Sequence, residues 1–564
     1  MAGLYAWKLR RRYYRARHDT RRDSNHVALP DMTFAFPSTA RDERELADLS
    51  RLLAALPRRI SDIPGLGSTD PAAEALRHGG RTWTFAELDA ATDAAATGLA
   101  AAGVRGGDRV LIVGENSPGL LALLFGVARL DAWAVIVNAR LSAREIDFIA
   151  AHCEPRRCAF TVEVSPDAAA HAARLGADER LAISGMADVR LTPRNDRCSP
   201  EPVHADPARQ VAALIYTSGT TGDPKGVMLT HRNLLFIARL SSTLRHLRSD
   251  DRVYAVLPIS HVYGLASVSL GTLFGGACLE LEPRFTASAM LAALMDHGGV
   301  TMLQGVPSMY AKLIDCIEAG GRDVQPPRLR ACFAGGSPLD ASLKAKVERV
   351  LGVTLHNGYG LTEAAPTIAH TRLDAPRADC SVGRALPGVE LRIVDLRDVD
   401  RPDVAAGASG ELWVRGPNVM HGYYKNDALT ARTINADGWL NTGDLARCDP
   451  DGTLFIVGRT KELIIRSGFN VYPPEVEAVL NSHPSITHSA VVGRTVPGNE
   501  EVIAFVELRP QASATAAEIA AYLRPLLAPY KQPAEIRIVP ALPVAANGKV
   551  LKHRLADLAR QSGA

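Results

Sequence analysis

Residues 216–226 read YTSGTTGDPKG, a glycine-rich loop that directly follows the apolar run QVAALIY (210–216). That run has the length and composition of a buried strand, and GVMLT (226–230) predicts a second strand after the loop. Glycine lets the backbone approach an anion closely because it carries no side chain, and Gly219, Gly222 and Gly226 supply three such positions. A strand followed by a loop of this kind is a setting in which proteins bind phosphate.

The loop also carries polar groups that suit phosphate binding. Lys225 adds a mobile positive charge. The spacing is not that of a Walker A loop, because only two residues separate Gly219 from Gly222 and Lys225 is followed by Gly226. Pro224 also prevents a helix from starting at the lysine. A hairpin loop without a ligand is the alternative, and the loop alone does not decide. The hydroxyl donors are Thr217, Ser218, Thr220 and Thr221.

Apolar runs of strand length recur on both sides of this loop. Helical stretches such as LLALLFGVARL (120–130) lie between them. This alternation predicts an α/β fold, in which helices cover two mostly parallel sheets. The strand candidates are RVLIV (109–113), AWAVIV (132–137), VYAVL (253–257), TMLQG (301–305), RACFAGG (330–336) and TLHNGYG (354–360).

The sequence pattern changes twice towards the C-terminus. Beyond about residue 380, short strands and turns such as VELRIVD and GELWVRGP predict a small β-module. From about residue 462, two helical stretches and three strand-like stretches predict a small α+β domain. We therefore expect a basic flexible arm (1–45), a large N-terminal domain (46–460) and a small C-terminal domain (461–564).

Positive charge is concentrated in residues 1–22, which carry eight Lys/Arg and one acidic residue. The rest of the chain holds 56 basic and 60 acidic residues, so its net charge of −4 argues against a nucleic-acid partner. For the arm, weak peripheral contact with a membrane is an alternative to a plain disordered tail. Eight scattered cysteines without a CxxC pair indicate a reducing compartment, and we expect a cytoplasmic location.

Residues 253–279 form the longest stretch without charged residues. The stretch contains Pro258, His261 and four glycines, so it predicts a strand, a loop and a buried helix instead of a membrane span. Four prolines between residues 193 and 207 predict a linker that leads into the glycine-rich loop.

Four further stretches combine turns with charged residues. In YGLTEAAP (359–366), Glu363 follows a predicted strand, where α/β sheets bind ligands and a carboxylate suits a divalent cation. In GWLNTGDLA (438–446), Asp444 follows a tight turn and is able to accept two ribose hydroxyls. Each stretch taken alone predicts an ordinary turn. The other two are GRTKELIIRSGFNVYPPEVE (458–477) and PVAANGKVLKHRL (543–555).

In this order and at these spacings, the five stretches closely resemble the adenylate-forming superfamily, which includes acyl-CoA synthetases, nonribosomal adenylation domains and firefly-type luciferases. The resemblance covers about residues 50–560. It implies that residues 46–460 form an AMP-binding domain and that residues 461–564 form a mobile domain. It implies an ATP-dependent acyl-CoA synthetase, with ATP, Mg²⁺ and coenzyme A. Such an enzyme adenylates a carboxylic acid, here in the first place a medium- or long-chain fatty acid, releases pyrophosphate and transfers the acyl group to CoA.

Several alternatives stay open at this point. Within the family they are an acyl-AMP ligase that loads a carrier protein and an aryl-CoA ligase. Outside it they are a kinase or plain ATPase and a non-catalytic module built on the basic arm. The sequence leaves the oligomeric state and the natural acid open.

The resemblance implies a set of nucleotide contacts. The loop, with Thr217, Ser218, Gly219, Thr220, Thr221, Gly222 and Lys225, matches the loop over the β- and γ-phosphates. Thr362 matches a phosphate contact and Glu363 the magnesium ligand. Asp444 and Arg459 match a ribose clamp. The positions that border adenine are Gly335, Gly336, Ser337, Asn357 and Tyr359.

The resemblance also implies how the acid and the thiol are handled. Lys549 matches the lysine that bridges the carboxylate and the α-phosphate, and Lys461 matches the hinge of the C-terminal domain. Gly468 matches a glycine beside the pantetheine tunnel. The expected substrate pocket contains His261, Tyr263, Gly358 and Gly360.

Two positions depart from relatives. Many plant-type relatives carry a lysine where Ile465 stands, and here the charge is displaced to Arg466, which puts the family's phosphate contacts in that segment in doubt. Acetate-specific relatives carry a tryptophan where Gly360 stands. We therefore expect a roomy acyl pocket that Gly360→Trp would narrow.

Overall fold

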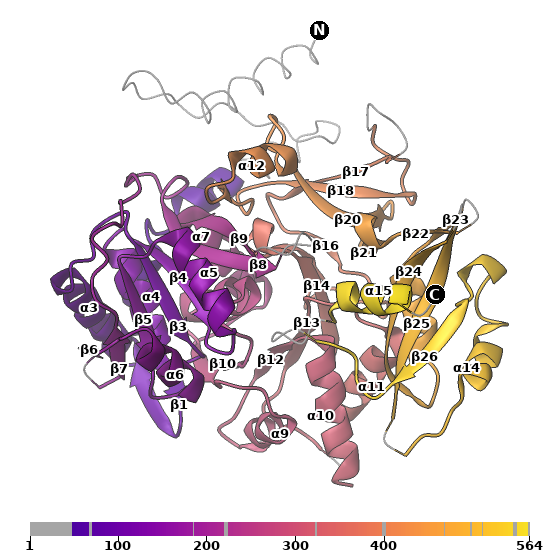
Figure 1. Ribbon diagram of the computed structural model, residues 1–564. Helices are drawn as coiled ribbons and strands as arrows, with labels where there is room; N and C mark the ends of the chain where they lie inside the picture. The colour runs from indigo at the N-terminus through magenta and orange to yellow at the C-terminus, as the bar shows by residue number, and fades with distance from the viewer. Residues whose placement is uncertain are drawn as a thin grey trace.

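The computed structural model describes residues 48–66, 70–183, 185–218, 224–321, 324–396, 402–466, 469–496, 499–509, 511–544 and 550–561. The fold is α/β, with a large N-terminal domain followed by a small C-terminal domain (Figure 1). The predicted arm, residues 1–45, lies outside the described residues.

A nine-stranded sheet forms one half of the large domain, in the order β16-β15-β14-β13-β12-β10-β11-β1-β2. Its strands from β14 to β1 are parallel, and the antiparallel pairs lie at the two edges. The strand–helix alternation predicted for this half is confirmed. The strands are β1 (Glu74–His78), β2 (Arg81–Thr84), β10 (Arg252–Ala255), β11 (Cys278–Leu281), β12 (Met302–Gly305), β13 (Ala331–Ala334), β14 (Leu355–Gly360), β15 (Thr367–His370) and β16 (Arg384–Ala385).

An eight-stranded sheet forms the other half, in the order β19-β9-β8-β4-β3-β5-β7-β6. Only β8, β4, β3 and β5 pair in parallel, because two hairpins and a short strand complete the edges. The hairpin β8–β9 carries the glycine-rich loop at its tip. The strands are β3 (Arg109–Gly114), β4 (Trp133–Asn138), β5 (Arg157–Thr161), β6 (Glu179–Ile183), β7 (Ala187–Leu191), β8 (Val211–Ser218), β9 (Pro224–Thr230) and β19 (Gly422–Tyr423).

Buried helices join the two sheets into one core. Helix α4 (Pro118–Arg129) is buried from Pro118 to Ala128, as expected for a helix that is apolar on all sides. It packs on β3 and β4 and against α3 (Phe85–Ala101). Helix α7 (His231–Leu244) contacts β8 and β9 on one side and the π-helical segment η2 (Tyr263–Leu270) on the other. Helices α9 (Ala287–Met295), α10 (Pro307–Ala319) and α11 (Ala341–Leu351) connect the strands of the nine-stranded sheet.

The charge-free stretch 253–279 folds as a strand, a loop and a buried helical segment, as predicted. It runs from β10 through η2 and α8 (Gly271–Phe274) to β11, and η2 is buried from Gly264 to Leu270. In the part of the chain that the structure describes, no helix has the length and apolar character needed to cross a membrane.

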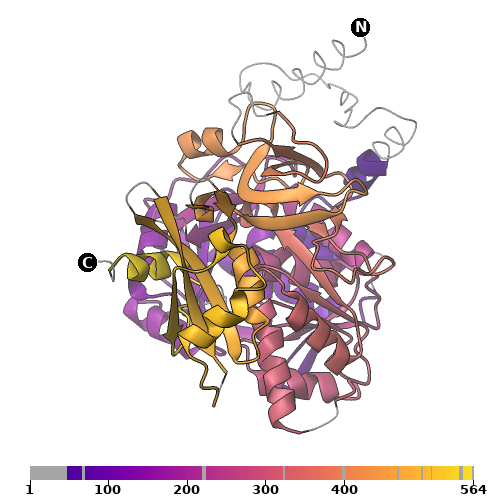
Figure 2. The same cartoon turned by 90° about the vertical axis from the view of Figure 1, so that its right-hand side faces the viewer.

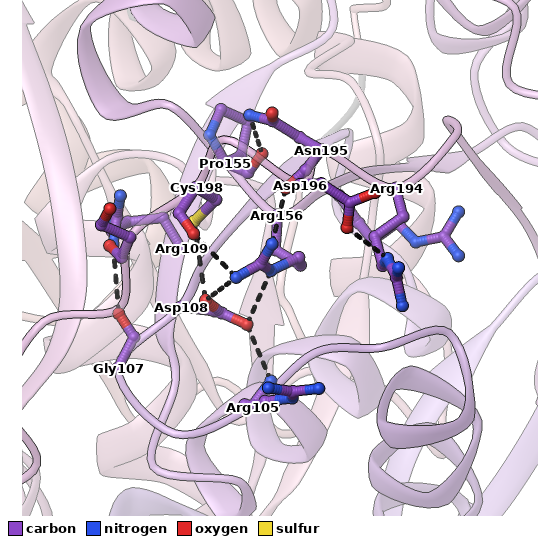
Figure 3. Close-up of polar contacts among 12 residues, drawn as sticks. Arg105, Gly107, Asp108, Arg109, Pro155, Arg156, Arg194, Asn195, Asp196 and Cys198 are labelled. Atoms are coloured by element: carbon purple, nitrogen blue, oxygen red, sulfur yellow. Dashed lines mark hydrogen bonds and ion pairs between the residues drawn. The ribbon is translucent and has the colours of Figure 1, made fainter.

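The proline-rich stretch 193–207 is anchored to the large domain by a buried ion pair (Figure 3). Arg156 donates from Nε and Nη2 to the two carboxylate oxygens of Asp108, at 3.0 and 3.1 Å. The same guanidinium donates to the carbonyls of Asn195 and Cys198, at 2.6 and 2.8 Å. The expected linker is therefore held in place, because one arginine bridges it to the strand that begins at Arg109.

The β-module and the C-terminal domain complete the chain. The module is a four-stranded sheet in the order β17-β18-β20-β21. In the C-terminal domain, helices lie against the sheet β24-β25-β26 (Figure 2). The sheet buries alternate residues on its two faces, so Val491 packs with α13 and α14 while Ala490 packs with α15. The elements are β17 (Glu390–Val394), β18 (Ser409–Arg415), α12 (Asp427–Thr433), β20 (Leu440–Cys448), β21 (Leu454–Arg459), β22 (Ile464–Arg466), β23 (Phe469–Val471), α13 (Pro473–Asn481), β24 (Ile486–Val496), β25 (Asn499–Leu508), α14 (Ala516–Leu523), β26 (Glu535–Val539) and α15 (Lys552–Gln561).

Candidate active site

The ends of the glycine-rich loop are held together by the β8–β9 hairpin. Thr217 pairs with Lys225, and Ser218 pairs with Pro224. The ammonium of Lys225 lies 5.7 Å from the centre of the Tyr423 ring, within the range of a cation–π contact. The loop residues Gly219, Thr220, Thr221 and Gly222 lie outside the described residues. The hairpin therefore brings the lysine and Thr217 to one place beside Tyr423.

Glu363 lies beside the same tyrosine. The Tyr423 hydroxyl donates to Glu363 Oε1 at 2.7 Å, and burial, followed by the nearby Glu363 carboxylate, raises the pKa of Tyr423. Tyr423 therefore stays a neutral donor. Glu363 Oε2 makes no hydrogen bond with the described residues, so the carboxylate keeps an oxygen for a cation. Mg²⁺ commonly binds one or two carboxylates together with substrate phosphates, and Glu363 fits that requirement.

Thr362 precedes Glu363 in the short 3₁₀ turn η3 (Thr362–Ala364) and is buried. The turn follows β14 directly, so both side chains lie at the carboxyl end of a strand of the parallel sheet. Ligands bind at this edge of open α/β sheets. Tyr423 was missed by the sequence analysis, because only the pairing of β19 with β9 brings this residue next to η3.

Asp444 lies in a clamp built from three strands. Tyr359 of β14 donates its hydroxyl to Asp444 Oδ2 at 2.6 Å, and Arg459 Nε lies 2.9 Å from Asp444 Oδ1. Asp444 and Arg459 are paired residues of β20 and β21. The Asp444 carboxylate raises the pKa of Arg459, while burial, followed by the Asp444 charge, raises the pKa of Tyr359. A carboxylate with four lone pairs accepts further hydroxyl donors in this position.

The predicted adenine positions converge on the ends of β13 and β14. Gly335 and Gly336 follow β13, and Gly336 adopts a left-handed backbone conformation with φ +79°. The Asn357 amide donates to the carbonyls of Cys380 and Ser381, at 3.0 and 3.3 Å. Asn357 therefore uses its NH₂ group to hold the neighbouring loop. Ser337 follows this pair of glycines and is only partly buried.

Side chains on the two faces of β14 contact different parts of the protein. Asn357 and Tyr359 contact the loop after β15 and the Asp444 clamp, whereas His356 stacks on Phe333, with ring centres 5.1 Å apart. Gly358 shares the face of His356, because successive side chains of a strand point to opposite sides. β14 therefore separates the clamp residues from a second set of residues around Phe333.

The expected substrate-pocket residues are grouped on that second face. A Cβ added at Gly335 would lie 3.3 Å from the Tyr263 ring, so the tyrosine covers the end of β13. The backbone N–H of Tyr263 donates to His261 Nδ1 at 3.3 Å. A Cβ added at Gly358 would lie 3.3 Å from the Cβ of His370. The structure therefore brings Tyr263, His261 and Gly358 to the same side of the sheet.

Gly360 lies against neighbouring backbone. A Cβ added there would lie 2.1 Å from the carbonyl oxygen of Pro366, a contact with backbone and not with open space. A larger side chain at this position therefore requires the backbone at Pro366 to shift. The narrowing of the acyl pocket by Gly360→Trp stays a prediction.

The C-terminal residues are described in part. Lys461 is exposed in a 3₁₀ turn, Thr460–Glu462, directly after β21. Gly468 and Lys549 lie outside the described residues. The ends of the segment that contains Lys549 meet, because Leu551 donates its N–H to the Pro543 carbonyl at 2.8 Å.

Lys552, three residues after Lys549, is fixed by two carboxylates. Its ammonium lies 3.0 Å from Glu462 and 2.8 Å from Glu477. Burial opposes the charge on Lys552, but these carboxylates raise its pKa. The sequence analysis missed this residue, because neither carboxylate is adjacent to it in the chain.

Arg466 is used inside the C-terminal domain. Its guanidinium donates to the carbonyls of Tyr530 and Gln532. Ile465, which stands where many plant-type relatives carry lysine, is 52% exposed. The displaced positive charge therefore joins β22 to a neighbouring turn, which accounts for Arg466 without a phosphate ligand.

The site combines a phosphate-type loop, a carboxylate suited to magnesium and an acidic clamp suited to ribose. Residues 67–424 match the family described as AMP-binding enzyme, and residues 475–549 match the AMP-binding enzyme C-terminal domain. The chain belongs to this family of adenylate-forming enzymes.

Relatives and solved structures agree with this assignment. The chain is 36% identical to feruloyl-CoA synthase of an Amycolatopsis species, a match that covers 86% of this chain and 98% of that protein. It is 35% identical to indoleacetate–CoA ligase of Aromatoleum aromaticum, with 87% and 96% covered. The structure of O-succinylbenzoate coenzyme A synthetase from Bacillus subtilis, in complex with ATP and a magnesium ion, has a TM-score of 0.73 and 28% identity, with 88% and 98% covered.

The protein is accordingly an AMP-forming acid–thiol ligase that uses ATP, Mg²⁺ and coenzyme A. A kinase, a plain ATPase or a non-catalytic module does not account for matches over both domains. The comparisons do not single out fatty acids, so the nature of the acid is a separate question.

Proposed function

We propose that the protein activates an aryl carboxylic acid and transfers the acyl group to CoA, which favours the aryl alternative over the fatty-acid expectation. The observation that carries this proposal is the set of rings on the second face of β14, where Tyr263 covers Gly335 and Phe333 stacks on His356. Flat side chains suit a flat acid. The substrates named for the feruloyl- and indoleacetate-CoA relatives give independent support.

The first half-reaction follows from the site residues. The acid's carboxylate attacks the α-phosphorus of ATP, pyrophosphate leaves, and acyl-AMP forms. Lys225 reduces the repulsion between the carboxylate and the nucleotide, and Glu363 would hold a magnesium ion that would supply further positive charge at the phosphates. Asp444 and Arg459 hold the ribose, and Lys549 stabilises the charge that develops at phosphorus.

In the second half-reaction, CoA reacts with acyl-AMP, and a different part of the C-terminal domain faces the site. The CoA thiol attacks the acyl carbon, AMP leaves, and the thiol proton passes to solvent. We assign the path of the thiol to the segment around Gly468, and the boundary between the two domains to residues 460 and 461. Rotation at Lys461 then exchanges Lys549 for Gly468 at the site. We also propose a cytoplasmic location, which suits CoA as acceptor.

An acid panel tests the proposal directly. Purified protein is given ATP, Mg²⁺, CoA and one acid at a time: cinnamic, 4-hydroxycinnamic, phenylacetic or octanoic acid. We expect kcat/KM for the best aryl acid to exceed that for octanoate by about tenfold or more. Octanoate turnover equal to or above that of every aryl acid would return the assignment to fatty acids.

A further inference from the structure

The strand register collects a second group of side chains on one face of the nine-stranded sheet. Gln304 of β12 pairs with Phe333 of β13, and Phe333 pairs with His356 of β14. Gly358, two residues after His356, pairs with His370 of β15. Paired residues share a face, so Gln304, Phe333, His356 and His370 all lie on the side of the expected acyl pocket.

A buried arginine lies against this face. Arg245, directly after α7, is 4% exposed, and its guanidinium lies 5.0 Å from the centre of the Phe333 ring. Nη1 donates to the Ser267 carbonyl of η2 at 3.0 Å. Among the described residues no carboxylate pairs with it, and burial lowers its pKa. An unpaired buried cation is costly, so the protein gains when a further acceptor reaches it.

Buried polar atoms without a hydrogen-bond partner in the described part of the chain lie on the same face of the sheet as Phe333, which the arginine contacts. Arg245 Nε, Gln304 Oε1 and His370 Nε2 are buried and have no hydrogen-bond partner among the described residues. His370 Nδ1 lies 2.6 Å from the Thr371 carbonyl, which makes Nδ1 the protonated nitrogen and leaves Nε2 as an acceptor. Burial keeps this ring neutral, with its pKa lowered to about 3. One donor, Arg245 Nε, and two acceptors, Gln304 Oε1 and His370 Nε2, are therefore available to a polar group of a ligand.

We propose that Arg245 is a specificity-determining residue that receives an oxygen acceptor at the end of the acid remote from the reacting carboxylate. The proposal rests on the proposed function, because the acid must lie on this face of the sheet. Two sources share the chemistry: a ring hydroxyl, which also donates to His370 Nε2 or Gln304 Oε1, and a second carboxylate, which pairs with the guanidinium. A purely alkyl terminus leaves all three groups without partners.

Pairs of matched acids test the role of Arg245 through the ratio of kcat/KM for an oxygen-bearing acid to that for its unsubstituted partner. Cinnamic acid is compared with 4-hydroxycinnamic and 4-carboxycinnamic acid, and octanoic acid with 8-hydroxyoctanoic and octanedioic acid. In the wild type, we expect an oxygen-bearing acid to have a kcat/KM about 10-fold or more above that of its unsubstituted partner, mostly through a lower KM. The hydroxyl and carboxylate members of each series distinguish the two sources of the acceptor.

Variants then assign the effect to the arginine. Arg245→Met should cut kcat/KM for the favoured oxygen-bearing acid by about 10- to 100-fold and that for the unsubstituted acid far less. Arg245→Lys should retain part of the discrimination, because it keeps the charge but loses the planar fork. Arg330→Met is the matched control. Arg330 donates to the Arg245 carbonyl and to Asp251, so its loss should affect stability and leave the ratio unchanged.

The outcomes separate the proposals. An unsubstituted acid preferred in both series by the wild type overturns the role of Arg245 without any variant. Equal losses for both members of a pair in Arg245→Met, with Arg245→Lys no different, also overturn it and make the arginine structural. If the octanoic series is used best but its oxygen-bearing members still depend on Arg245, the aryl assignment fails and the arginine proposal stands.

Discussion

Lys552 of α15 lies 3.0 Å from Glu462, the residue that follows Lys461. The same ammonium lies 2.8 Å from Glu477 of α13. The start of α15 is therefore tied both to α13 and to the turn that contains Lys461, the proposed hinge residue.

We expect Lys552→Met to slow acid-dependent pyrophosphate exchange by about tenfold, which corresponds to ~1.4 kcal/mol of lost positioning. Conversion of supplied acyl-AMP and CoA should change much less, because we propose that Lys549 acts in the first half-reaction. Lys346→Met is the control, since Lys346 pairs with Glu318 on the surface of the large domain. Equal slowing of the two half-reactions would mean that Lys552 only stabilises the fold.

The two half-reactions should be separable by mutation. Lys549→Ala should lower adenylate formation by about 10²–10³-fold, as deletion of a transition-state donor does, and should spare the thioester step. Gly468→Leu should have the opposite effect, because the added bulk obstructs the thiol. Each variant is assayed in both half-reactions after circular dichroism confirms its fold. A common factor in both assays would refute domain rotation.

Tyr423→Phe should weaken the response to magnesium. The hydroxyl donates to Glu363 Oε1 at 2.7 Å and orients the carboxylate, so its removal should raise the Mg²⁺ concentration for half-maximal activity several-fold, by about 3- to 10-fold. Activity at saturating Mg²⁺ should recover most of the wild-type value. Tyr424→Phe, which removes a hydrogen bond to Glu201, is the neighbouring control and should leave the Mg²⁺ response unchanged.

Two buried histidines predict loss of stability in acid. Burial lowers the pKa of His356 to about 4 and that of His370 to about 3, from 6.5. Below pH 6.5 the unfolded chain binds protons that the folded chain excludes, so stability is present above this pH and falls as pH falls. Each ring contributes a slope of about 1.4 kcal/mol per pH unit. Thermal melting of His370→Gln between about pH 7 and about pH 5 should show a smaller loss than that of the wild type.

The buried pair Asp108–Arg156 predicts a stability effect without a catalytic one. Asp108→Asn leaves the guanidinium buried without its charge partner, a change that costs about 3–5 kcal/mol. The midpoint of urea unfolding should fall, while KM for ATP in the folded enzyme stays unchanged. A changed KM with an unchanged midpoint would show that the pair acts on the site.

The strands and the hairpin were predictable because their signals are local. The runs at 109–113 and 253–257 are apolar and short, and Pro224 excludes a helix after the glycine-rich loop. The hydrogen bonds from Tyr359 to Asp444 and from Tyr423 to Glu363 were not predictable from spacing. The first joins β14 to β20, which belong to different sheets, and the second depends on the pairing of β19 with β9. The role proposed for Arg245 was not predictable for the same reason. The proposal depends on the lack of a carboxylate partner among the described residues, and only the packed structure shows that.

Successive side chains of β14 point to opposite faces, so the register of the strand fixes which residues face each side. Asn357 and Tyr359 face one side and His356 and Gly358 the other, so a single inserted or deleted residue would exchange the two sets at once. Substitutions on the His356 side leave the Asp444 clamp in place. We therefore expect a point substitution on the His356 side to change the choice of acid while the nucleotide contacts stay, and a change in the length of this strand to disturb both.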